Sequence, residues 1–211
     1  MAGTLVKICG ISTPDTLAAA VGAGASHVGF VHFAKSPRHL ALADAAALRR
    51  QLPAHVKVVL LLVNADPATL AEAVRTVAPD VVQFHGSETP ESLARFRAET
   101  GIEAWRAMAV RDAESLAAVA AFRGAADRVL LDAPASALPG GNGTAFDWSL
   151  LAGWQAPLAW GLAGGLTPAN VAEAIRLTGA PLVDTSSGVE RSPGIKDVDK
   201  IAAFCKAARQ A

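Results

Sequence analysis

The sequence predicts one domain of the α/β class, residues 1–211, folded as a closed (β/α)8 barrel. Eight short apolar runs alternate with eight longer amphipathic segments along the 211 residues, and strict alternation of this kind builds a parallel sheet. The runs are rich in Val, Leu and Ile, which is typical of strands buried on both faces. Eight strand–helix units of roughly 25 residues fill a barrel near the lower size limit of about 200 residues.

The expected strands are nearly continuous apolar stretches. In chain order they comprise residues 5–9, 27–31, 57–63, 80–84, 103–107, 128–132, 158–162 and 181–184. Because all of them would be parallel, their carboxyl ends meet at one face of the barrel, where the active sites of such barrels lie.

The expected helices carry the start and stop signals of helices in globular proteins. In chain order they comprise residues 14–21, 43–51, 67–77, 90–100, 113–122, 148–151, 168–177 and 198–209. Several begin with an N-cap residue and a proline suited to the first helical position, at Thr13-Pro14, Asp66-Pro67, Thr89-Pro90 and Thr167-Pro168. The glycines expected to end helices are Gly22, Gly101 and Gly179.

The composition excludes several classes of protein. Hydrophobic residues make up 52% and charged residues 18% of the chain, which is typical of a globular protein and not of a disordered one. Lys+Arg and Asp+Glu both number 19, so a general electrostatic hold on nucleic acid or a membrane is not expected. Two cysteines form no disulfide framework, and the histidines have no metal-ligand spacing, so no metal is expected.

Neither a membrane span nor an open nucleotide-binding sheet is expected. Residues 148–172 contain no charge, but glycines and prolines interrupt them, which favours two short buried elements. The first residues contain neither a basic leader nor a long apolar run, so we expect a soluble cytoplasmic protein. Cys9-Gly10-Ile11-Ser12 after the first strand lacks the glycine-rich fingerprint of the alternative, a doubly wound fold.

Three side chains near expected strand ends are suited to chemistry at the barrel mouth. Cys9 is either a nucleophile or base there, or a small buried hydrophobe. Asp132 closes an apolar strand, where desolvation raises a carboxyl pKa and suits a general acid; a capping role is the alternative. Arg38, on the loop after the second strand, either grips a carboxylate or is a solvated surface charge.

Small and polar residues follow the last two strands. In barrels of this kind the loops after strands seven and eight are the usual phosphate site, because small residues let backbone N–H groups surround an anion. Tight turns without a ligand are the alternative. The candidate phosphate-binding residues are Gly164, Gly165, Asp184, Ser186 and Ser187.

Polar residues are also expected on the inner faces of two strands. Gln83 and His85 share one face by the two-residue period, where they either orient a polar substrate or brace neighbouring loops. Lys7 and Cys9 share a face as well, and a cation below the sulfur would favour the thiolate. The alternative for Lys7 is a structural ion pair with Asp184 on the adjoining eighth strand.

Taken together and in this order, these segments resemble the phosphoribosylanthranilate isomerase family of tryptophan biosynthesis. The Lys-Ile-Cys-Gly start, combined with Ser-Pro-Arg and Ser-Ser-Gly-Val-Glu, is specific to this family. The matching stretches span nearly the whole chain: Lys7-Ile-Cys9-Gly10-Ile11, Gly29-Phe30, Lys35-Ser-Pro-Arg38, Val63-Asn64, Val82-Gln83, His85-Gly86, Leu131-Asp132, Gly140-Gly141, Phe146-Asp147-Trp148, Leu162-Ala-Gly164-Gly165-Leu166, Asn170-Val171, Asp184, Ser186-Ser-Gly-Val-Glu190 and Gly194-Ile-Lys-Asp197.

The resemblance implies a TIM barrel of the ribulose-phosphate-binding type that performs an Amadori rearrangement without a cofactor. N-(5-phosphoribosyl)anthranilate would open its ribose ring and become 1-(2-carboxyphenylamino)-1-deoxyribulose 5-phosphate. By the same resemblance, Asp132 is the general acid at the ring oxygen, and Cys9 removes the proton from C2 of the ribose. Arg38 would hold the anthranilate carboxylate, and the loops at Gly164-Gly165 and Ser186-Ser187 would hold the phosphate.

The chain departs from the family pattern at several positions. His32-Phe33-Ala34 replaces a more aromatic and proline-containing run, and Phe84 and Leu62 are apolar replacements. In the loop after the sixth strand, Asn142 stands where a Thr is usual, and Thr144-Ala145 replaces a Lys-containing pair. These differences bear on turnover and affinity more than on the type of reaction.

Two other functions are weighed against this one. Related barrels perform the same chemistry on a phosphoribosyl-imidazole intermediate of histidine biosynthesis, but the resemblance would call there for a carboxylate in place of Cys9. A non-catalytic sugar-phosphate binding protein would be expected if Cys9 or Asp132 were missing, and neither is. We expect a small phosphorylated substrate as the partner, no nucleic acid or membrane, and a monomer or weak homodimer.

Overall fold

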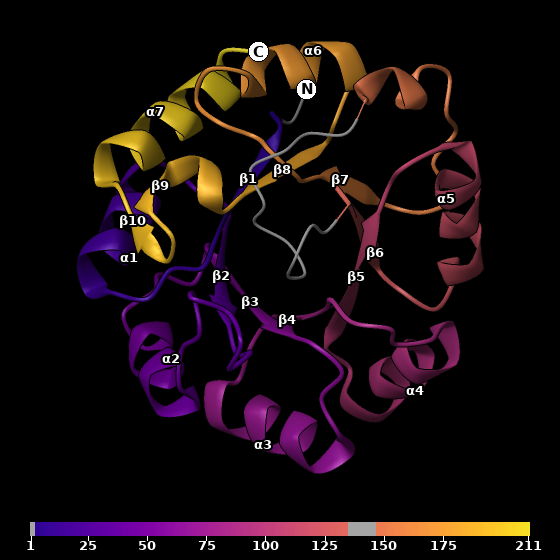
Figure 1. Cartoon of the computed structure of the whole chain (residues 1–211). Helices are drawn as coiled ribbons and strands as arrows, with labels where there is room; N and C mark the ends of the chain where they lie inside the picture. The colour runs from indigo at the N-terminus through magenta and orange to yellow at the C-terminus, as the bar shows by residue number, and fades with distance from the viewer. Residues whose placement is uncertain (1–2, 135–146) are drawn as a thin grey trace.

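A computed structural model describes residues 3–134 and 147–211 of the chain. Eight parallel strands, β1 to β8, close into a barrel in which each strand pairs with its sequence neighbours and β8 pairs with β1. Helices form an outer ring around this barrel (Figure 1). The prediction of a (β/α)8 barrel is therefore confirmed.

The strands lie close to their expected positions, and their register determines which residues become neighbours. Lys7 of β1 lies beside Asp184 of β8 on one side and His27 of β2 on the other. Cys9 lies beside Gly29 of β2. The strands are β1 Leu5–Cys9, β2 His27–Val31, β3 Lys57–Leu62, β4 Val81–Phe84, β5 Glu103–Ala109, β6 Arg128–Asp132, β7 Trp160–Leu162 and β8 Leu182–Thr185.

The outer layer consists of α-helices and short 3-10 helices. The α-helices of the described residues are α1 Pro14–Gly22, α2 Leu42–Arg49, α3 Pro67–Val77, α4 Pro90–Thr100, α5 Ala113–Ala117, α6 Val171–Thr178 and α7 Val198–Arg209. The 3-10 helices are η1 Ala118–Phe122, η2 Trp148–Leu151 and η3 Ser187–Val189.

Three expected helices differ from the structure. Residues 113–122 divide into α5 and η1, and residues 148–151 form only the 3-10 turn η2. Helix α6 begins at Val171 and not at residue 168. The reason is a turn in which the Asn170 side chain accepts a hydrogen bond from the Thr167 N–H at 2.8 Å, so Thr167 does not cap the helix.

The other capping signals are largely confirmed. First-turn N–H groups donate to the side chains of Thr13, Asp66 and Thr89. Gly101 and Gly179 end α4 and α6 in the left-handed conformation. Gly22 is instead the last residue of α1, and the left-handed residue that turns the chain toward β2 is Gly24.

A small hairpin follows β8 that the sequence did not predict. Strands β9 (Glu190–Ser192) and β10 (Ile195–Lys196) pair antiparallel outside the barrel. Each is too short to show a two-residue alternation of polar and apolar residues. In the chain the hairpin follows η3 and precedes α7, and in Figure 1 it lies between α7 and α1.

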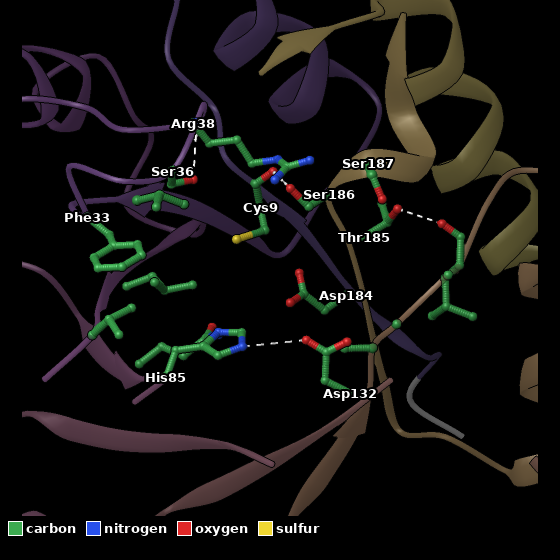
Figure 2. Close-up of a pocket in the computed structure, with 18 residues that line it drawn as sticks. Cys9, Phe33, Ser36, Arg38, His85, Asp132, Asp184, Thr185, Ser186 and Ser187 are labelled. Atoms are coloured by element: carbon green, nitrogen blue, oxygen red, sulfur yellow. Dashed lines mark hydrogen bonds and ion pairs between the residues drawn. The ribbon is translucent and has the colours of Figure 1, made fainter. Parts of the chain in front are cut away.

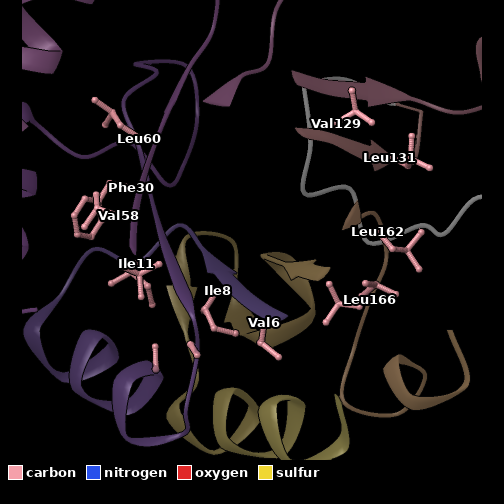
Figure 3. Close-up of a cluster of buried hydrophobic side chains, with 14 of the residues drawn as sticks. Val6, Ile8, Ile11, Phe30, Val58, Leu60, Val129, Leu131, Leu162 and Leu166 are labelled. Carbon is pink, nitrogen blue, oxygen red and sulfur yellow. The ribbon is translucent and has the colours of Figure 1, made fainter. Parts of the chain in front are cut away.

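Two apolar layers support the barrel. The outer layer joins strands to helices, and Figure 3 shows Val6 and Ile8 of β1 within it. The inner layer is a separate cluster that fills the barrel, formed by Val59, Val81, Trp105, Ala107, Leu130 and Leu182. A Cβ at Gly161 would lie 2.6 Å from a Leu182 methyl group, so the inner layer is packed without spare room.

The uncharged segment 148–172 folds as expected into short elements, η2 and β7, followed by the first residues of α6. Within residues 3–134 and 147–211, none of the helices has both the length and the apolar character that crossing a membrane requires.

The packing predicts a large loss of stability for Leu60→Ala in β3. Leu60 is 0% exposed between the sheet and the helices, so the variant should lose about 2–5 kcal/mol of unfolding free energy. Leu177→Ala is the matched control, because Leu177 is 64% exposed and its loss should change stability by less than about 0.5 kcal/mol. Urea unfolding followed by circular dichroism measures both, and equal losses would contradict the assignment of the core.

Candidate active site

A pocket opens at the carboxyl ends of the barrel strands (Figure 2). Side chains from β1, β4, β6 and β8 and from the loops after β2 and β7 converge on it. Its lining includes every residue that the sequence predicted for a site: Cys9, Arg38, Gln83, His85, Asp132, Gly164, Gly165, Asp184, Ser186 and Ser187. The fold thus gathers residues that are spread from the first barrel strand to the last.

Cys9 is the last residue of β1, and its side chain forms part of the pocket wall. It is only 5% exposed and packs against Val31 and Leu61. Gly29 makes room for the sulfur, because a Cβ there would lie 3.0 Å from Sγ. Burial raises the pKa of the Cys9 thiol, and the nearby Lys7 cation offsets this only in part. In the free protein at neutral pH, Cys9 is therefore a thiol.

Lys7 and Asp184 form an ion pair inside the barrel. Lys7 Nζ lies 2.9 Å from Asp184 Oδ2, and the lysine side chain is 0% exposed. Burial, the largest single cause, would lower the pKa of Lys7, but the interactions with Asp184 and Cys9 together outweigh it and the pKa is raised. The structural ion pair considered for Lys7 is therefore present. The Lys7 cation also favours the thiolate of Cys9, but the pKa of Cys9 stays raised, so the thiol remains the main form.

Asp184, one of the expected phosphate-binding residues, carries a carboxylate that is paired with Lys7. A carboxylate repels a phosphate dianion and offers it no hydrogen-bond donor. One oxygen of Asp184 is held by Lys7, while the other, Oδ1, is buried without a hydrogen-bond partner among the described residues. Asp184 lines the pocket, and its charge is one of the causes that raise the pKa of Asp132.

Asp132 is the last residue of β6, and the pKa of its carboxyl group is raised. Burial, with the charge of Asp184 as the next cause, raises the pKa of Asp132 to about 7. The Ala133 N–H donates to Asp132 Oδ1 at 2.8 Å, and this hydrogen bond opposes the shift without cancelling it. A carboxyl group with such a pKa is matched to proton donation near neutral pH.

His85 lies next to Asp132, with 3.6 Å between His85 Nε2 and Asp132 Oδ2. Burial and the charges of Lys7 and Arg106 lower the pKa of His85 to about 4, so the imidazole is neutral. Gln83 is buried, and its Nε2 lies 3.3 Å from His85 Nδ1. When the amide donates to Nδ1, the imidazole proton is on Nε2 and faces Asp132.

The loop that carries His85 is braced by charged residues that the sequence did not single out. Glu88 accepts hydrogen bonds from the Asn64 N–H at 2.7 Å and the Gly86 N–H at 2.8 Å. Arg106 Nη2 donates to the Gly86 carbonyl at 2.7 Å, and its Nη1 pairs with Glu88 at 3.1 Å. No residue pattern indicated this brace, because its members come from three different strand–helix units.

Arg38 lies in the pocket wall, but part of its guanidinium is already engaged. Arg38 Nε and Nη2 donate to the two carboxylate oxygens of Glu190 at 2.7 and 2.8 Å. The edge that includes Nη1 has no hydrogen bond to another described residue and is the one left for a ligand. A substrate carboxylate that binds the free edge does not compete with Glu190. It would compete only at the edge formed by Nε and Nη2.

The loops after β7 and β8 are tight. Gly164 and Gly165 have φ values of 80° and 65°, and a Cβ at Gly164 would lie 2.3 Å from the Ala133 nitrogen. Ser186 donates through Oγ to the Cys9 carbonyl at 3.1 Å, so the loop after β8 is attached to the end of β1. Ser187 opens the 3-10 helix η3 beside it.

Some expected features cannot be placed. Gly140-Gly141, Asn142, Thr144-Ala145 and Phe146, in the loop after β6, lie outside the described residues. In the part of the chain that the structure describes, no group of three or more His, Cys, Asp or Glu side chains is arranged to hold a metal ion.

A barrel whose mouth gathers a carboxylic acid, a thiol and tight glycine loops defines an enzyme of the class that acts on small phosphorylated substrates. The sequence profile of the family N-(5'phosphoribosyl)anthranilate (PRA) isomerase matches residues 6–207. The chain belongs to this family. It is 60% identical to the N-(5'-phosphoribosyl)anthranilate isomerase of Erythrobacter litoralis over 99% of this chain and 100% of that one.

Solved structures show the same relationship. The phosphoribosylanthranilate isomerase of Thermotoga maritima superposes with a TM-score of 0.90 at 35% identity, over 99% of this chain and 100% of that one. A phosphoribosylanthranilate isomerase in complex with reduced 1-(o-carboxyphenylamino)-1-deoxyribulose 5-phosphate superposes with a TM-score of 0.87 at 34% identity, with the same coverage.

The charge distribution predicts that Lys7→Met raises the thiol pKa of Cys9 further. The Lys7 cation, which is the largest cause that favours the thiolate, is lost in this variant. A pH titration of thiolate absorbance, in a Cys205→Ala background, measures the shift. Lys57→Met is the control, because Lys57 begins β3, pairs with Glu103 and lies at the opposite end of the barrel. A lower or unchanged pKa in Lys7→Met would disprove the electrostatic link.

Proposed function

We propose that Asp132 and Cys9 are the general acid and general base in the isomerisation of N-(5'-phosphoribosyl)anthranilate, the reaction of the family to which the chain belongs. The observation that carries this assignment is that both side chains line one pocket from β6 and β1. These strands are separated by β7 and β8 around the barrel, so the two groups reach a bound sugar from different sides. Figure 2 shows the two side chains converging on the same space.

The first step opens the ribose ring. Asp132 donates its proton to the ring oxygen, and the bond between that oxygen and C1 breaks. The lone pair of the anthranilate nitrogen forms a double bond to C1, which gives a positively charged imine. The pKa of about 7 keeps a large fraction of Asp132 protonated at neutral pH, as this step needs.

The second step removes the proton from C2. Cys9 first gives its thiol proton to solvent and then accepts the C2 proton as a thiolate. The electron pair of the C–H bond forms a double bond between C2 and C1, and the imine nitrogen becomes neutral. The positive imine beside Cys9 stabilises the thiolate, which offsets the burial that raises its pKa in the free protein.

The resulting enol returns to a ketone when C1 gains a proton and the C2 hydroxyl loses one. C1 is reduced and C2 is oxidised within one molecule, so the reaction balances without an external oxidant or reductant. We accordingly propose no cofactor and no metal for this chemistry.

Both ends of the substrate are anionic, and each would be bound by a different part of the pocket. The free edge of Arg38 suits the anthranilate carboxylate, because a guanidinium edge matches the geometry of a carboxylate. Gly164, Gly165, Ser186 and Ser187 suit the phosphate, since closely packed backbone N–H groups surround an anion well. Gln83 and His85, which were expected to bind substrate, are better placed to orient Asp132.

We propose further that the enzyme acts in the cytoplasm as a monomer or weak homodimer, with no nucleic acid or membrane partner. The zero net charge supports the lack of polyanionic partners. A solved isomerase from Thermotoga maritima is described as dimeric, with monomers generated from it. Sedimentation over a range of protein concentrations measures the oligomeric state of this chain.

The central test is an isomerase assay with the substrate generated in place from anthranilate and phosphoribosyl pyrophosphate by the preceding transferase. The loss of substrate fluorescence should be fast for the wild type and slower by about 10²- to 10⁴-fold for Cys9→Ala and for Asp132→Asn. Cys205→Ala is the control, because Cys205 is buried in α7 away from the pocket. Conversion of the phosphoribosyl-imidazole intermediate in place of the anthranilate substrate would instead establish the alternative function.

The raised pKa of Asp132 predicts a variant that is inactive and more stable. In the unfolded chain Asp132 ionises above about pH 4, whereas in the folded protein it stays protonated up to about pH 7. Stability is therefore lost as the pH rises between these values, and Asp132→Asn avoids the loss. Above pH 7 we expect this variant to gain on the order of 1–4 kcal/mol over the wild type, and little near pH 4.

Urea unfolding at both pH values measures this difference. The control is Asp127→Asn, just before β6, where the carboxylate pairs with Arg97 at 2.6 Å and the substitution should give no gain. A stability gain in Asp132→Asn that is the same at both pH values would argue against a protonated Asp132.

A further inference from the structure

The hairpin after β8 places a buried carboxylate behind Arg38. Glu190, the first residue of β9, accepts hydrogen bonds from Arg38 Nε and Nη2 at 2.7 and 2.8 Å. Lys196 of β10 donates to the same carboxylate, with 2.7 Å between Nζ and Oε1. Glu190 is thus held by Arg38 from the loop after β2 and by Lys196 from β10. Neither Glu190 nor Lys196 lines the pocket itself.

Lys196 connects this carboxylate to the loop after β8. Its Nζ donates to the Ser186 carbonyl at 2.9 Å and to the Ser186 hydroxyl at 3.1 Å. Ser186 in turn donates to the carbonyl of Cys9. One chain of hydrogen bonds therefore runs from the guanidinium of Arg38 to the backbone of Cys9.

Close backbone packing leaves this chain little freedom. Gly10, directly after Cys9, has a φ of 79°, and a Cβ there would lie 2.9 Å from Arg38 Cδ and 3.2 Å from Lys196 Nζ. A Cβ at Gly194, between the two hairpin strands, would lie 2.3 Å from the Pro37 carbonyl oxygen. The hairpin is therefore pressed against the loop that carries Arg38.

The charges in this cluster do not cancel. Burial alone would raise the pKa of Glu190, but hydrogen bonds from Arg38 and Lys196 outweigh it, and the pKa is lowered. One carboxylate therefore faces two cations, which leaves one net positive charge. The side chain of Arg38 is 11% exposed and that of Lys196 only 1%, so an anion in the pocket meets this charge at Arg38.

We propose that Glu190, held by Lys196, is a positioning residue that aims the free edge of Arg38 into the pocket and thereby selects substrates that carry a carboxylate. This inference rests on the proposed function, in which Arg38 binds the anthranilate carboxylate. Glu190 itself does not touch the substrate. Its role is to hold the guanidinium in one orientation, so that a ligand carboxylate finds both donors in place.

The test compares two substrates in wild type and Glu190→Gln. One is N-(5-phosphoribosyl)anthranilate, and the other is N-(5-phosphoribosyl)aniline, which lacks only the carboxylate. We expect the preference for the first substrate, the ratio of the two kcat/KM values, to fall by about 10- to 100-fold. For the anthranilate substrate, most of the decrease in kcat/KM should come from a higher KM. For the aniline substrate, kcat should change little.

Charge alone predicts the opposite result. Glu190→Gln removes a negative charge and makes the cluster more positive, which would strengthen the binding of any anion. A fall in carboxylate preference therefore supports the positioning role. An unchanged or increased preference, or an equal loss with both substrates, overturns it and leaves Glu190 a purely structural residue.

Two further variants complete the experiment. Glu103→Gln is the matched control, because Glu103 also pairs with a lysine but begins β5 at the opposite end of the barrel, and its substitution should leave the preference unchanged. If Glu190→Gln does not fold, Glu190→Asp decides, since it keeps the charge and shortens the reach: a reduced preference supports the inference and an unchanged one overturns it. Absence of wild-type turnover would instead refute the proposed function.

Discussion

The ion pair between Lys7 and Asp184 is the interaction that influences the pKa values of the other titratable side chains in the pocket. It joins the first and last strands of the barrel and lies beneath the mouth, where both side chains are removed from water. Its cation opposes the burial that raises the pKa of Cys9 and adds to the burial that lowers the pKa of His85. Its carboxylate contributes to the raised pKa of Asp132. A pair is needed there, because either charge alone would be costly to bury.

Burial then has different consequences for the two side chains that we propose as general base and general acid. Both Cys9 and Asp132 favour their neutral forms, because desolvation is the largest cause of both shifts. For an acid this is the useful form, and Asp132 is ready to donate. For a base it is not, so in the proposed mechanism Cys9 depends on the positive charge that ring opening creates. The proposed order of the two steps thus follows from the burial of both groups in one pocket.

The mouth of the barrel is also supported from outside the barrel. The β9–β10 hairpin lies after the last barrel strand, yet its Glu190 and Lys196 reach the loop after β2 and the end of β1. Arg38 is oriented by this contact and not by its own loop alone. The opposite side of the mouth has a comparable brace, in which Glu88 and Arg106 hold the loop that carries His85. Rigid loops of this kind keep catalytic groups in place.

The alternation of apolar runs and capped helices was enough to predict the barrel, and the position of a residue at a strand end was enough to predict that Cys9 and Asp132 share its mouth. These features are local, so a sequence shows them directly. The inward face of Lys7 and the adjoining eighth strand also made an ion pair with Asp184 one of two expectations for that lysine, and strand register brings the two residues together. The partner of Arg38 was decided only by the tertiary structure, because a hairpin far along the chain brings Glu190 to it. A contact of this kind leaves no periodic pattern from which it could be predicted.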